Sequence, residues 1–434
     1  MTGRIRIQNK MSLPEVIEII PLGSSPEMEI TVPGSKSITN RSLILAALSN
    51  GEVILDNALW SEDTQVMVDA LRQLGYKIEV NLDSLESGNR NLIIEGRGGS
   101  IPKGGTPENP MELFVGNAGT AARFLTAFLC LGKGTYRLSG ISRMHERPQA
   151  SLIEALRTLG YCIDSKNNKL PLTIHAGGPT FKSCRVSIEE SSQFASALLL
   201  LAKLGGWNVE IDGELGANSP YVAMTSSLID CFPTEGGRLK IEPDASSGSY
   251  FWAAGHILSR GTCLPLKVAR WPKSGWQIDA EFTSFLPLPN IVSRRDDLGD
   301  SIMTAIVIAP LTGHQTQFVN LERLRLQECE RVQALRTELT KCGATIQEAG
   351  ESLTISPGEL KGAEIETYDD HRIAMSFAAL GLKVPGIRIK NPCCVRKTFP
   401  TFFYKLAAPA PHGLGATILD GKGNKLKAEQ LIAG

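Results

Sequence analysis

The chain alternates polar segments with long apolar runs, and this alternation recurs six times. Each copy begins with residues rich in Ser, Asn, Asp or Gly, continues into an apolar run of helical length, and passes a glycine before a β-branched segment. A polar start followed by an almost unbroken apolar run predicts a buried helix with a capped first turn. The predicted buried helices span residues 37–47, 120–131, 192–204, 247–258, 301–311 and 371–380.

Glycines lie where these predicted helices end. We expect them to act as C-caps, and they are Gly51, Gly132, Gly205, Gly261, Gly313 and Gly381. In the clearer copies a strand (53–55, 136–139 or 318–320) and a second, more amphipathic helix (61–74, 148–159 or 328–341) follow. Each second helix ends at a further glycine, Gly75, Gly160 or Gly343. The third and fourth copies are short, and residues 265–295, rich in Pro and Trp, show little periodicity.

The repeat and the chain length together predict the fold class. The copies are spaced by roughly 55–80 residues, more than the 20–50 residues of solenoid repeats, so each copy predicts a small α/β unit of its own. A chain of 434 residues exceeds one ordinary domain, so we expect two domains. The content of 42% hydrophobic and 21% charged residues is typical of a globular protein with large cores.

Charge and cysteine usage exclude several classes of protein. Lys plus Arg and Asp plus Glu are both 45, so the chain lacks the basic footprint of a nucleic-acid-binding protein. The nine cysteines show no Cys-x-x-Cys pair and no Cys/His metal spacing, which indicates reduced thiols and predicts no metal. The N-terminal segment does not read as a secretory signal, and no apolar run reaches the ~18 residues that span a bilayer. We expect a soluble, cytoplasmic protein.

Cationic residues accompany the polar starts of the helices. A helix N-terminus offers free backbone N–H groups and a positive dipole end, so it binds an anion readily. Six independent N-caps would explain the Ser and Asp residues, but not Lys36, Arg41, Arg123, His371 and Arg372. If the copies pack symmetrically, several helix ends converge on one site that holds anions.

Short motifs stand out in order between about residues 30 and 406. They are Pro33-Gly-Ser-Lys-Ser-Ile-Thr-Asn-Arg41, Leu113-Phe-Val-Gly-Asn-Ala-Gly-Thr120 with Arg123, Glu146-Arg-Pro148, Ser191-Ser-Gln193, Asp244-Ala-Ser-Ser247, Asp370-His-Arg372 and Lys397-Thr-Phe-Pro400. Each motif alone is weak evidence, but the set is specific. Together the motifs resemble those of the 5-enolpyruvylshikimate-3-phosphate (EPSP) synthase family.

The resemblance implies a two-domain enolpyruvyl transferase fold of the α/β class. Each domain would hold three copies of a βαβαββ-type unit around buried parallel helices. One domain would span residues 34–242 and the other residues 1–33 plus 243–434, with the active site in the cleft between them. The family needs no metal and no organic cofactor, and a monomer suits it.

The resemblance also implies a reaction. The enolpyruvyl group of phosphoenolpyruvate would move to the 5-hydroxyl of shikimate 3-phosphate by addition and elimination, with release of phosphate. This is a step of the shikimate pathway, which leads to chorismate and the aromatic amino acids. The two substrates would be the small-molecule partners of the protein.

The motif positions assign residues to each substrate by resemblance. For shikimate 3-phosphate they are Lys36, Ser37, Arg41, Ser191, Ser192, Gln193, Tyr221, Asp300 and Gln327. For phosphoenolpyruvate they are Lys36, Asn117, Gly119, Arg147, Gln193, Arg331, Arg372 and Lys397. Asp300 matches the family's proton acceptor and Glu328 its proton donor, while Lys36 would stabilise developing charge. The cations among these residues roughly balance the charge of about −5 to −6 on the two substrates.

Two features depart from the family pattern. The family usually has Arg-x-Lys-Glu-Ser/Thr-Asp-Arg where this chain reads Arg325-Leu-Gln-Glu-Cys-Glu-Arg331, so Gln327 replaces a Lys expected to contact shikimate 3-phosphate. Arg323, near an expected Asn, is a candidate to compensate for that Lys. The segment between Pro265 and Asp300 is also short, which predicts a lost helix or hairpin away from the site.

Two other functions fit parts of the pattern. UDP-N-acetylglucosamine enolpyruvyl transferase shares the fold, but it has Lys-Asn in place of Lys36-Ser37 and usually a loop Cys that residues 142–147 lack. A degenerate member that binds substrates without turnover is made conceivable by Gln327. The family is the target of glyphosate, and Gly119 followed by Thr120 predicts the sensitive type.

Overall fold

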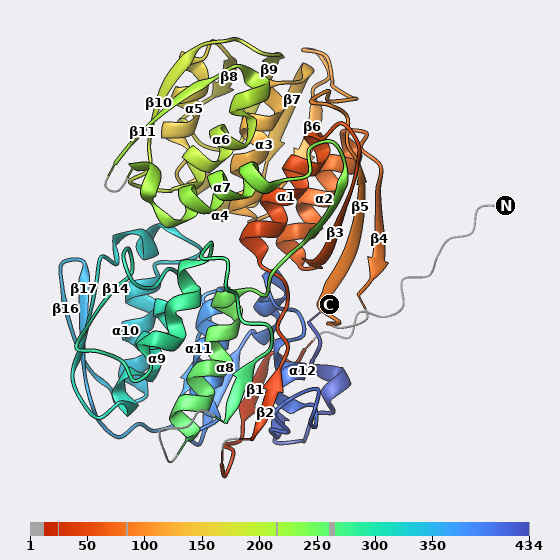
Figure 1. The fold of residues 1–434 in the computed structure, drawn as a ribbon. Coiled ribbons are helices and arrows are strands. Elements are labelled where there is room, and N and C mark those ends of the chain that lie inside the picture. Colours follow the sequence, from red (N-terminus) through yellow and green to blue (C-terminus); the bar gives the residue numbers. More distant parts are fainter. Residues whose placement is uncertain (1–12, 25, 84–85, 214–215, 260–264, 434) are drawn as a thin grey trace.

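The computed structural model describes residues 13–24, 26–83, 86–213, 216–259 and 265–433. Buried apolar side chains form two separate cores within this part of the chain. The first core runs from Ile38 to Ile241. The second combines residues 13–32 with residues 250–433. We call the structures around these cores the first and second lobes; they are the upper and lower parts of Figure 1.

Four of the sheets share one strand plan, in which a parallel pair is followed by two antiparallel neighbours. Two of them belong to the first lobe: β12 (Gly237–Lys240), β3 (Glu52–Leu59), β5 (Asn89–Glu95) and β4 (Ile78–Leu82); and β6 (Met111–Phe114), β7 (Lys133–Ser139), β9 (Leu172–Gly177) and β8 (Cys162–Ser165). Two belong to the second lobe: β14 (Ile291–Ser293), β15 (Thr316–Val319), β17 (Ser352–Ser356) and β16 (Thr345–Ala349); and β18 (Glu364–Ile365), β19 (Ile387–Lys390), β1 (Val16–Ile19) and β20 (Ile418–Asp420).

Two shorter sheets complete the repeat. They are the parallel pairs β10 (Ser183–Ser187) with β11 (Asn208–Asp212), and β13 (Leu266–Val268) with β2 (Met28–Ile30). They belong to the third and fourth copies, whose sequences are also short. Each lobe therefore contains two full sheets and one abbreviated sheet among the described residues, and the six-copy interpretation is confirmed.

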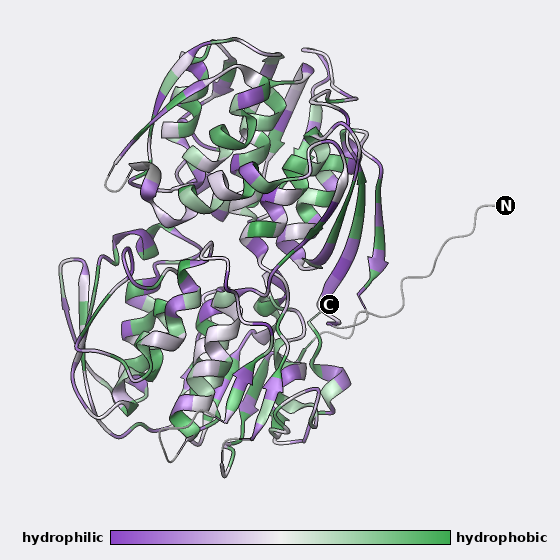
Figure 2. Cartoon of the chain, in the orientation of Figure 1, coloured by the Kyte–Doolittle hydropathy of each residue, from purple (hydrophilic) through white to green (hydrophobic). Residues whose placement is uncertain are grey.

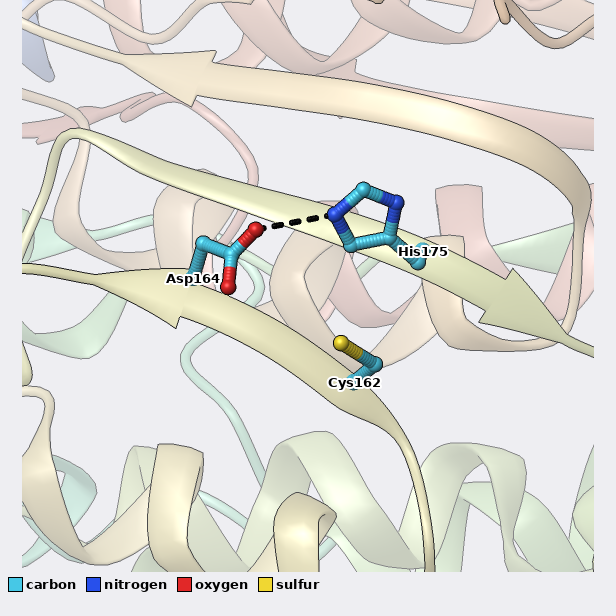
Figure 3. Close-up of side chains that lie close together, drawn as sticks. All are labelled: Cys162, Asp164 and His175. Atoms are coloured by element: carbon cyan, nitrogen blue, oxygen red, sulfur yellow. Dashed lines mark hydrogen bonds and ion pairs between the residues drawn. The ribbon is translucent and has the colours of Figure 1, made fainter. Parts of the chain in front are cut away.

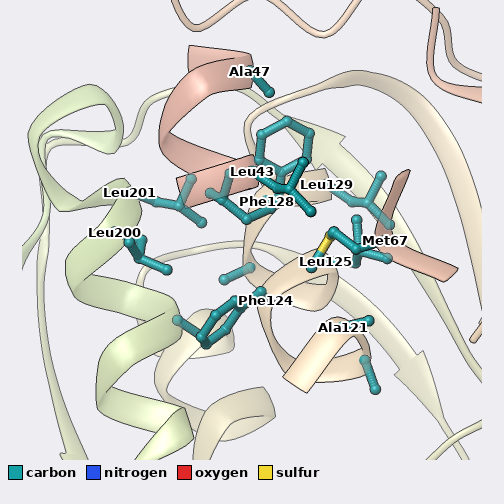
Figure 4. Close-up of a cluster of buried hydrophobic side chains, with 14 of the residues drawn as sticks. Leu43, Ala47, Met67, Ala121, Phe124, Leu125, Phe128, Leu129, Leu200 and Leu201 are labelled. Carbon is teal, nitrogen blue, oxygen red and sulfur yellow. The ribbon is translucent and has the colours of Figure 1, made fainter. Parts of the chain in front are cut away.

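The six predicted buried helices are all present. They are α1 (Lys36–Leu48), α3 (Gly119–Cys130), α6 (Gln193–Gly205), α8 (Ala245–Leu258), α9 (Ile302–Ile308) and α11 (His371–Gly381). Figure 4 shows how three of them pack: α1, α3 and α6 meet through Leu43, Phe124, Phe128 and Leu201, and these side chains are almost fully inaccessible to water. In Figure 2 the hydrophobic colour is frequent on the helices inside the first lobe, and the strands of both lobes carry bands of both colours. Burial of this apolar area supplies the main stabilisation of each lobe.

Gly313 and the Gly-Gly pair after α6 act as predicted, whereas the other described glycines beside the buried helices do not. Gly313 has φ of 84° just beyond the 3-10 turn that extends α9. The Gly-Gly pair ends α6. There Gly206, next to the predicted Gly205, is the left-handed C-cap, with φ of 65°. Helix α1 ends instead at Ser49, whose hydroxyl donates to the Leu45 carbonyl and leaves no need for glycine. A Cβ at Gly51 would collide with the Glu235 carbonyl, so close backbone approach explains that glycine. Gly261 lies outside the described residues.

The second helices are α2 (Glu62–Gln73), α5 (Ala150–Thr158) and α10 (Arg331–Lys341). Their terminal glycines are confirmed, because Gly75, Gly160 and Gly343 have φ of 98°, 99° and 90°. The residue after each glycine donates its N–H to the carbonyl five residues back, which is the Schellman pattern, as Tyr76 does to Leu71 at 3.0 Å. The predicted start of α10 at residue 328 is wrong, because Glu330 caps the helix through the Gln333 N–H.

The remaining helices lie between these repeated elements. They are α4 (Ser142–Glu146), α7 (Pro220–Cys231) and α12 (Phe402–Ala407), with 3-10 turns at Gly216–Asn218, Ile278–Phe285, Ala309–Leu311, Glu322–Leu326, Pro392–Lys397 and Ala428–Leu431. No helix in the described ranges is both long and apolar enough to cross a membrane. The chain passes between the lobes twice, where Gly34 and Pro243 form an isolated bridge.

Candidate active site

One cavity lies where the N-terminal ends of six helices meet. Its lining includes residues at the starts of α1, α3, α6 and α8, together with Asp300 before α9 and Arg372 in the first turn of α11. Three of these helices belong to each lobe. The predicted convergence of helix ends on one site is therefore confirmed.

The predicted site residues fall around this cavity and a smaller one beside it. The larger cavity is lined by Lys36, Ser37, Arg41, Ser191, Ser192, Gln193, Tyr221, Asp300, Gln327, Arg147 and Arg372. The smaller cavity adds Gly119, Glu328 and Arg331. Asn117 and Lys397 line neither cavity, but the Asn117 carbonyl accepts from Arg147 Nη1 at 3.2 Å and from Lys397 Nζ at 2.8 Å. All the predicted positions are thus brought together.

Arg41 is a buried cation held by neutral oxygens. It donates to the Thr225 hydroxyl at 2.7 Å, the Ser37 carbonyl at 2.9 Å and the Ser196 hydroxyl at 3.0 Å. Its guanidinium also lies 5.3 Å from the centre of the Phe124 ring. Burial lowers the pKa of Arg41 to about 10. A cation desolvated in this way gains most from an anion that binds in the cavity.

Arg123, on α3, is a second buried cation held by neutral oxygens. Nη1 donates to the Gln193 side chain at 2.7 Å and Nη2 to the Pro148 carbonyl at 3.0 Å. Burial, aided by the neighbouring Arg147, lowers the pKa of Arg123 to about 9. Arg123 was noted in the sequence as a cation at a helix start, but the family motifs gave it no role.

Asp63 joins two of the predicted cations. Its carboxylate forms ion pairs with Lys36 Nζ at 3.2 Å and with Lys397 Nζ at 3.1 Å. Asp63 lies on α2 in the first lobe, whereas Lys397 comes from the second lobe. The carboxylate therefore holds both ammonium groups at the edge of the cavity and links the lobes.

Asp300 lies among three arginines of the second lobe. Arg294 Nη2 is 3.2 Å from Oδ1, Arg372 Nη2 is 3.1 Å from Oδ2, and Arg331 Nη1 is 4.0 Å from Oδ1. Burial acts to raise the pKa of Asp300, but the three cations outweigh it and hold the pKa below its ordinary value. The carboxylate is therefore ionised near neutral pH.

Glu328 is buried beside the cations predicted for phosphoenolpyruvate. Arg331 Nη2 is 2.8 Å from Oε2, and Arg147 Nη1 approaches Oε1 at 3.9 Å from the other lobe. Burial acts to raise the pKa of Glu328, yet Arg331, Arg147 and Lys397 hold it well below its ordinary value. Arg331 is itself fixed by Asp370, 2.6 Å from its Nε.

Gln327 stands at the position where the family usually has a Lys, and its side-chain amide faces Asp300 and Arg331. Its Nε2 is 3.5 Å from Asp300 Oδ1, and its Oε1 accepts from Arg331. The Gln327 carbonyl accepts from Arg143 Nη2 at 2.9 Å, and Arg143 belongs to α4 in the first lobe. Arg323 reaches the opposite way and donates to the Ile188 and Glu189 carbonyls. Two arginines therefore span the cleft in opposite directions.

The segment between Pro265 and Asp300, which is short compared with the family pattern, contributes residues to the site. Gln277, Asp279 and Arg294 all line the larger cavity. Asp279 accepts from the Ser246 hydroxyl at 2.6 Å and the Ser301 N–H at 2.8 Å, so it joins the starts of α8 and α9. The weak periodicity of this irregular segment gave no signal for these contacts.

Gly119 begins α3 at the smaller cavity. A Cβ built there would lie 2.8 Å from the Arg147 guanidinium and 2.9 Å from Arg123 Nη1. Glycine is therefore required for the two arginines to approach the helix start together.

The one group of metal-ligand side chains found in the described ranges, Cys162, Asp164 and His175, lies elsewhere, on β8 and β9.

Comparisons with known proteins identify the family of the chain. The family model for EPSP synthase (3-phosphoshikimate 1-carboxyvinyltransferase) matches residues 23–267 and 292–406. The interruption falls on the segment with little periodicity. The chain is 37% identical over 429 residues to the 3-phosphoshikimate 1-carboxyvinyltransferase of Nostoc punctiforme, covering 90% of this chain and 98% of the relative. The corresponding protein of Laribacter hongkongensis is 38% identical over 426 residues, covering 87% and 96%.

Solved structures show the same fold. EPSP synthase from Acinetobacter baumannii superimposes with a TM-score of 0.72 at 21% identity, covering 93% of this chain and 99% of that one. The enolpyruvyl transferase NikO from Streptomyces tendae gives 0.67 at 14% identity, covering 94% and 99%. The architecture is thus the two-domain enolpyruvyl transferase fold. Since the family model covers most of the chain, the protein belongs to the EPSP synthase (3-phosphoshikimate 1-carboxyvinyltransferase) family.

Proposed function

We propose that this protein transfers the enolpyruvyl group of phosphoenolpyruvate to the 5-hydroxyl of shikimate 3-phosphate and releases phosphate. One observation carries the proposal: the starts of six helices and a set of buried cations face a single cavity. Helix starts and buried guanidinium groups both favour phosphate and carboxylate ligands. The substrates supply two phosphates and two carboxylates.

Phosphoenolpyruvate would bind between Arg147, Arg331, Arg372 and Lys397. Arg147 comes from the first lobe and the others from the second, so the substrate would draw charge from both. Gly119 supports this placement, since it leaves space for the Arg147 guanidinium at the start of α3. The planar guanidinium fork suits both the carboxylate and the phosphate of this substrate.

Shikimate 3-phosphate would occupy the larger cavity. Its phosphate would bind at Ser191, Ser192 and Gln193, the polar start of α6, with Arg41 and Lys36 across the cavity. Tyr221 and Asp300 would contact the sugar-like ring. This pose directs the 5-hydroxyl toward the smaller cavity, where phosphoenolpyruvate would lie.

Asp300 and Glu328 would handle the protons of the reaction. The ionised Asp300 would accept the proton of the 5-hydroxyl as it attacks C2 of phosphoenolpyruvate. Glu328 would protonate the methylene carbon, and Lys36 would stabilise the developing charge. When the phosphate and carboxylate of phosphoenolpyruvate bind Arg331, Arg147 and Lys397, they cancel the field that keeps the pKa of Glu328 low. Substrate binding would thereby prepare the acid.

The family usually has a Lys at the position of Gln327. Arg294 would supply the positive charge that this Lys provides. Arg294 Nη2 and Gln327 Nε2 both face Oδ1 of Asp300, at 3.2 and 3.5 Å. A Lys at residue 327 would place its ammonium near the same oxygen. Arg323 is less suited to this role, because two of its guanidinium nitrogens are engaged by carbonyls of the first lobe.

The lobes would be the two domains, residues 34–242 and residues 1–33 plus 243–434. The separate cores support this division, and the bridge between Gly34 and Pro243 lies at both crossings. Each domain contributes cations to the cavity, so one copy of the chain would form the complete site. A monomer without a cofactor would therefore suffice.

The test measures phosphate release from phosphoenolpyruvate with shikimate 3-phosphate and, separately, with UDP-N-acetylglucosamine. We expect release with the first acceptor alone. Asp300→Ala should abolish release, while the exposed Asp69→Ala on α2 should retain it. Release with only the second acceptor would reassign the substrate, and no release with either would support an inactive binding protein.

The role of Arg294 is tested with the same assay. Arg294→Gln should raise the KM for shikimate 3-phosphate, and adding Gln327→Lys should recover part of the loss. An Arg294→Gln enzyme with an unchanged KM would contradict the role. The single Gln327→Lys variant measures how much the KM for shikimate 3-phosphate depends on having Gln rather than Lys at this position.

A further inference from the structure

The outer face of the β8–β9 hairpin carries three side chains of different metal-ligand types. Cys162 lies directly opposite His175 in the antiparallel pair, and Asp164 lies two residues farther along β8. Side chains two apart on a strand share a face, so all three project to the same side. Figure 3 shows them grouped there, while Ile163 and Ile174 face the core.

The distances within this group suit one metal ion. One ligand atom from each residue lies within 4.8 Å of the others, and His175 Nε2 is 2.9 Å from Asp164 Oδ2. Zinc bonds of about 2.0–2.3 Å in a tetrahedral arrangement place ligand atoms about 3.3–3.8 Å apart. Small side-chain rotations on an exposed face are enough to reach that spacing, and the backbone does not need to move.

The histidine ring is already oriented for such a site. Thr135 on β7 is the cross-strand partner of His175, and its hydroxyl is 3.5 Å from Nδ1. That contact turns Nε2 toward Asp164. In protein metal sites the second ring nitrogen of a ligating His is held in a similar way by a hydrogen-bond partner.

The charges near the group are mixed. Asp164 also lines a shallow hollow with Arg137, Arg157 and Lys166. Arg137 has a partner in Glu112 at 3.8 Å, and Arg157 donates to the Ile163 carbonyl. The Cys162 thiol would lose its proton to solvent on binding. Its thiolate and the Asp164 carboxylate would then neutralise the divalent ion, so the loaded group carries no net positive charge beside these cations.

We propose that Cys162, Asp164 and His175 bind a zinc-like divalent ion, with water as the fourth ligand. Sulfur, imidazole nitrogen and carboxylate together favour zinc or its analogue cobalt(II) over magnesium or calcium, which prefer oxygen ligands. The group lies on the outer face of the first lobe, and none of its residues lines the cavities of the proposed active site. The inference is therefore independent of the proposed function.

Cobalt(II) titration of the reduced, untagged full-length protein tests the site. We expect one equivalent to bind with a near-ultraviolet thiolate-to-cobalt charge-transfer band, and zinc to displace it. Cys162→Ser should remove the band, and Asp164→Asn and His175→Gln should weaken binding at least about tenfold, or about 1.4 kcal/mol. Cys231→Ser, which changes another exposed cysteine, is the matched control and should behave as wild type.

Two results would overturn the proposal. One is a wild-type protein that shows no charge-transfer band at excess cobalt. The other is a band that persists in Cys162→Ser. Circular dichroism and enolpyruvyl transfer serve as folding controls for every variant, because these exposed residues lie outside the cavities. Loss of metal binding with transfer intact would support the site even if the substrate assignment changed.

Discussion

Single side chains in the cleft are fixed by opposing charges rather than by apolar packing. Asp300, Glu328 and Asp370 together hold four buried arginines within salt-bridge distance, namely Arg147, Arg294, Arg331 and Arg372. Each charge is tolerated in the interior because its partner is close and hydrogen-bonded. Anionic substrates would compete for the same arginines, so a substitution at one position changes both binding and protonation.

Gly119→Ala tests how tightly the arginines approach α3. The new Cβ would lie 2.8 Å from the Arg147 guanidinium, which must then shift. We expect the KM for phosphoenolpyruvate to rise by about tenfold, or about 1.4 kcal/mol, with a smaller change for shikimate 3-phosphate. Glyphosate inhibition, which we expect for wild type, should weaken in parallel. Equal increases in both KM values would contradict the placement.

Asp300→Asn tests the pKa of that carboxyl through stability. Because its pKa is lower in the folded than in the unfolded protein, the charge stabilises the fold above about pH 4, and this contribution is lost as pH falls toward the folded value. Denaturant unfolding at pH 7 and pH 3 should therefore show a variant deficit that shrinks at the lower pH. The exposed Asp69→Asn should change little at either pH, and a pH-independent deficit would refute the assignment.

At the scale of elements, some helix ends can be predicted from the sequence and others cannot. The Schellman glycines after α2, α5 and α10 follow from local chain geometry, and all three were predicted. The glycines after most buried helices serve tertiary contacts instead, as Gly51 does beside Glu235. A local pattern cannot distinguish a cap from a close approach of distant backbone.

Gly343→Ala measures how much the Schellman glycine after α10 contributes to the free energy of unfolding. Gly343 has φ of 90°, and a Cβ there meets no atom closer than 3.8 Å, so the strain is purely conformational. We expect a loss of about 1–2 kcal/mol in the free energy of unfolding. The matched control is Gly358→Ala, where φ is not positive and space is open; it should be neutral or gain up to about 1 kcal/mol. Equal effects would contradict this explanation.

The same distinction holds for the candidate site. The motif residues could be identified because they stand in short stretches that resemble the family motifs. Some of them, such as Lys36, Gln193 and Arg372, also lie at helix starts, a local signal that survives in the sequence. Arg294 and Asp279 were missed, since they lie in an irregular segment that the tertiary fold brings to the cavity. Arg143 was missed for the same reason, because its partners are carbonyls 184 and 185 residues away.

At the scale of the whole molecule, a buried polar group ties the lobes at their crossing. Lys405 Nζ lies 2.7 Å from Glu86 Oε2 and 2.8 Å from the Thr31 hydroxyl, which itself donates to Glu86. Glu86 belongs to the first lobe, whereas Lys405 is on α12 of the second. The group therefore fixes the lobes near the pivot about which domain closure would turn.

Lys405→Met tests that connection. It leaves the Glu86 carboxylate buried without its cation, which typically costs about 3–5 kcal/mol of unfolding free energy. The double variant with Glu86→Gln should recover part of the loss, and chemical denaturation measures both. Additive losses would show that the pair is not coupled. Surface Lys203→Met is a control for the loss of a lysine.

Strand β1 lies between β19 and β20, so the second lobe closes only around a strand that precedes both partners in the chain. Its partners leave the ribosome roughly 370 residues later, about 20–75 s at 5–20 residues per second. During that interval the first lobe can fold, while Ile17 and Ile19 await their neighbours. Until those partners are made, β1 is an unpaired, apolar strand edge, and the yield of folded protein should depend on chaperones that shield that segment.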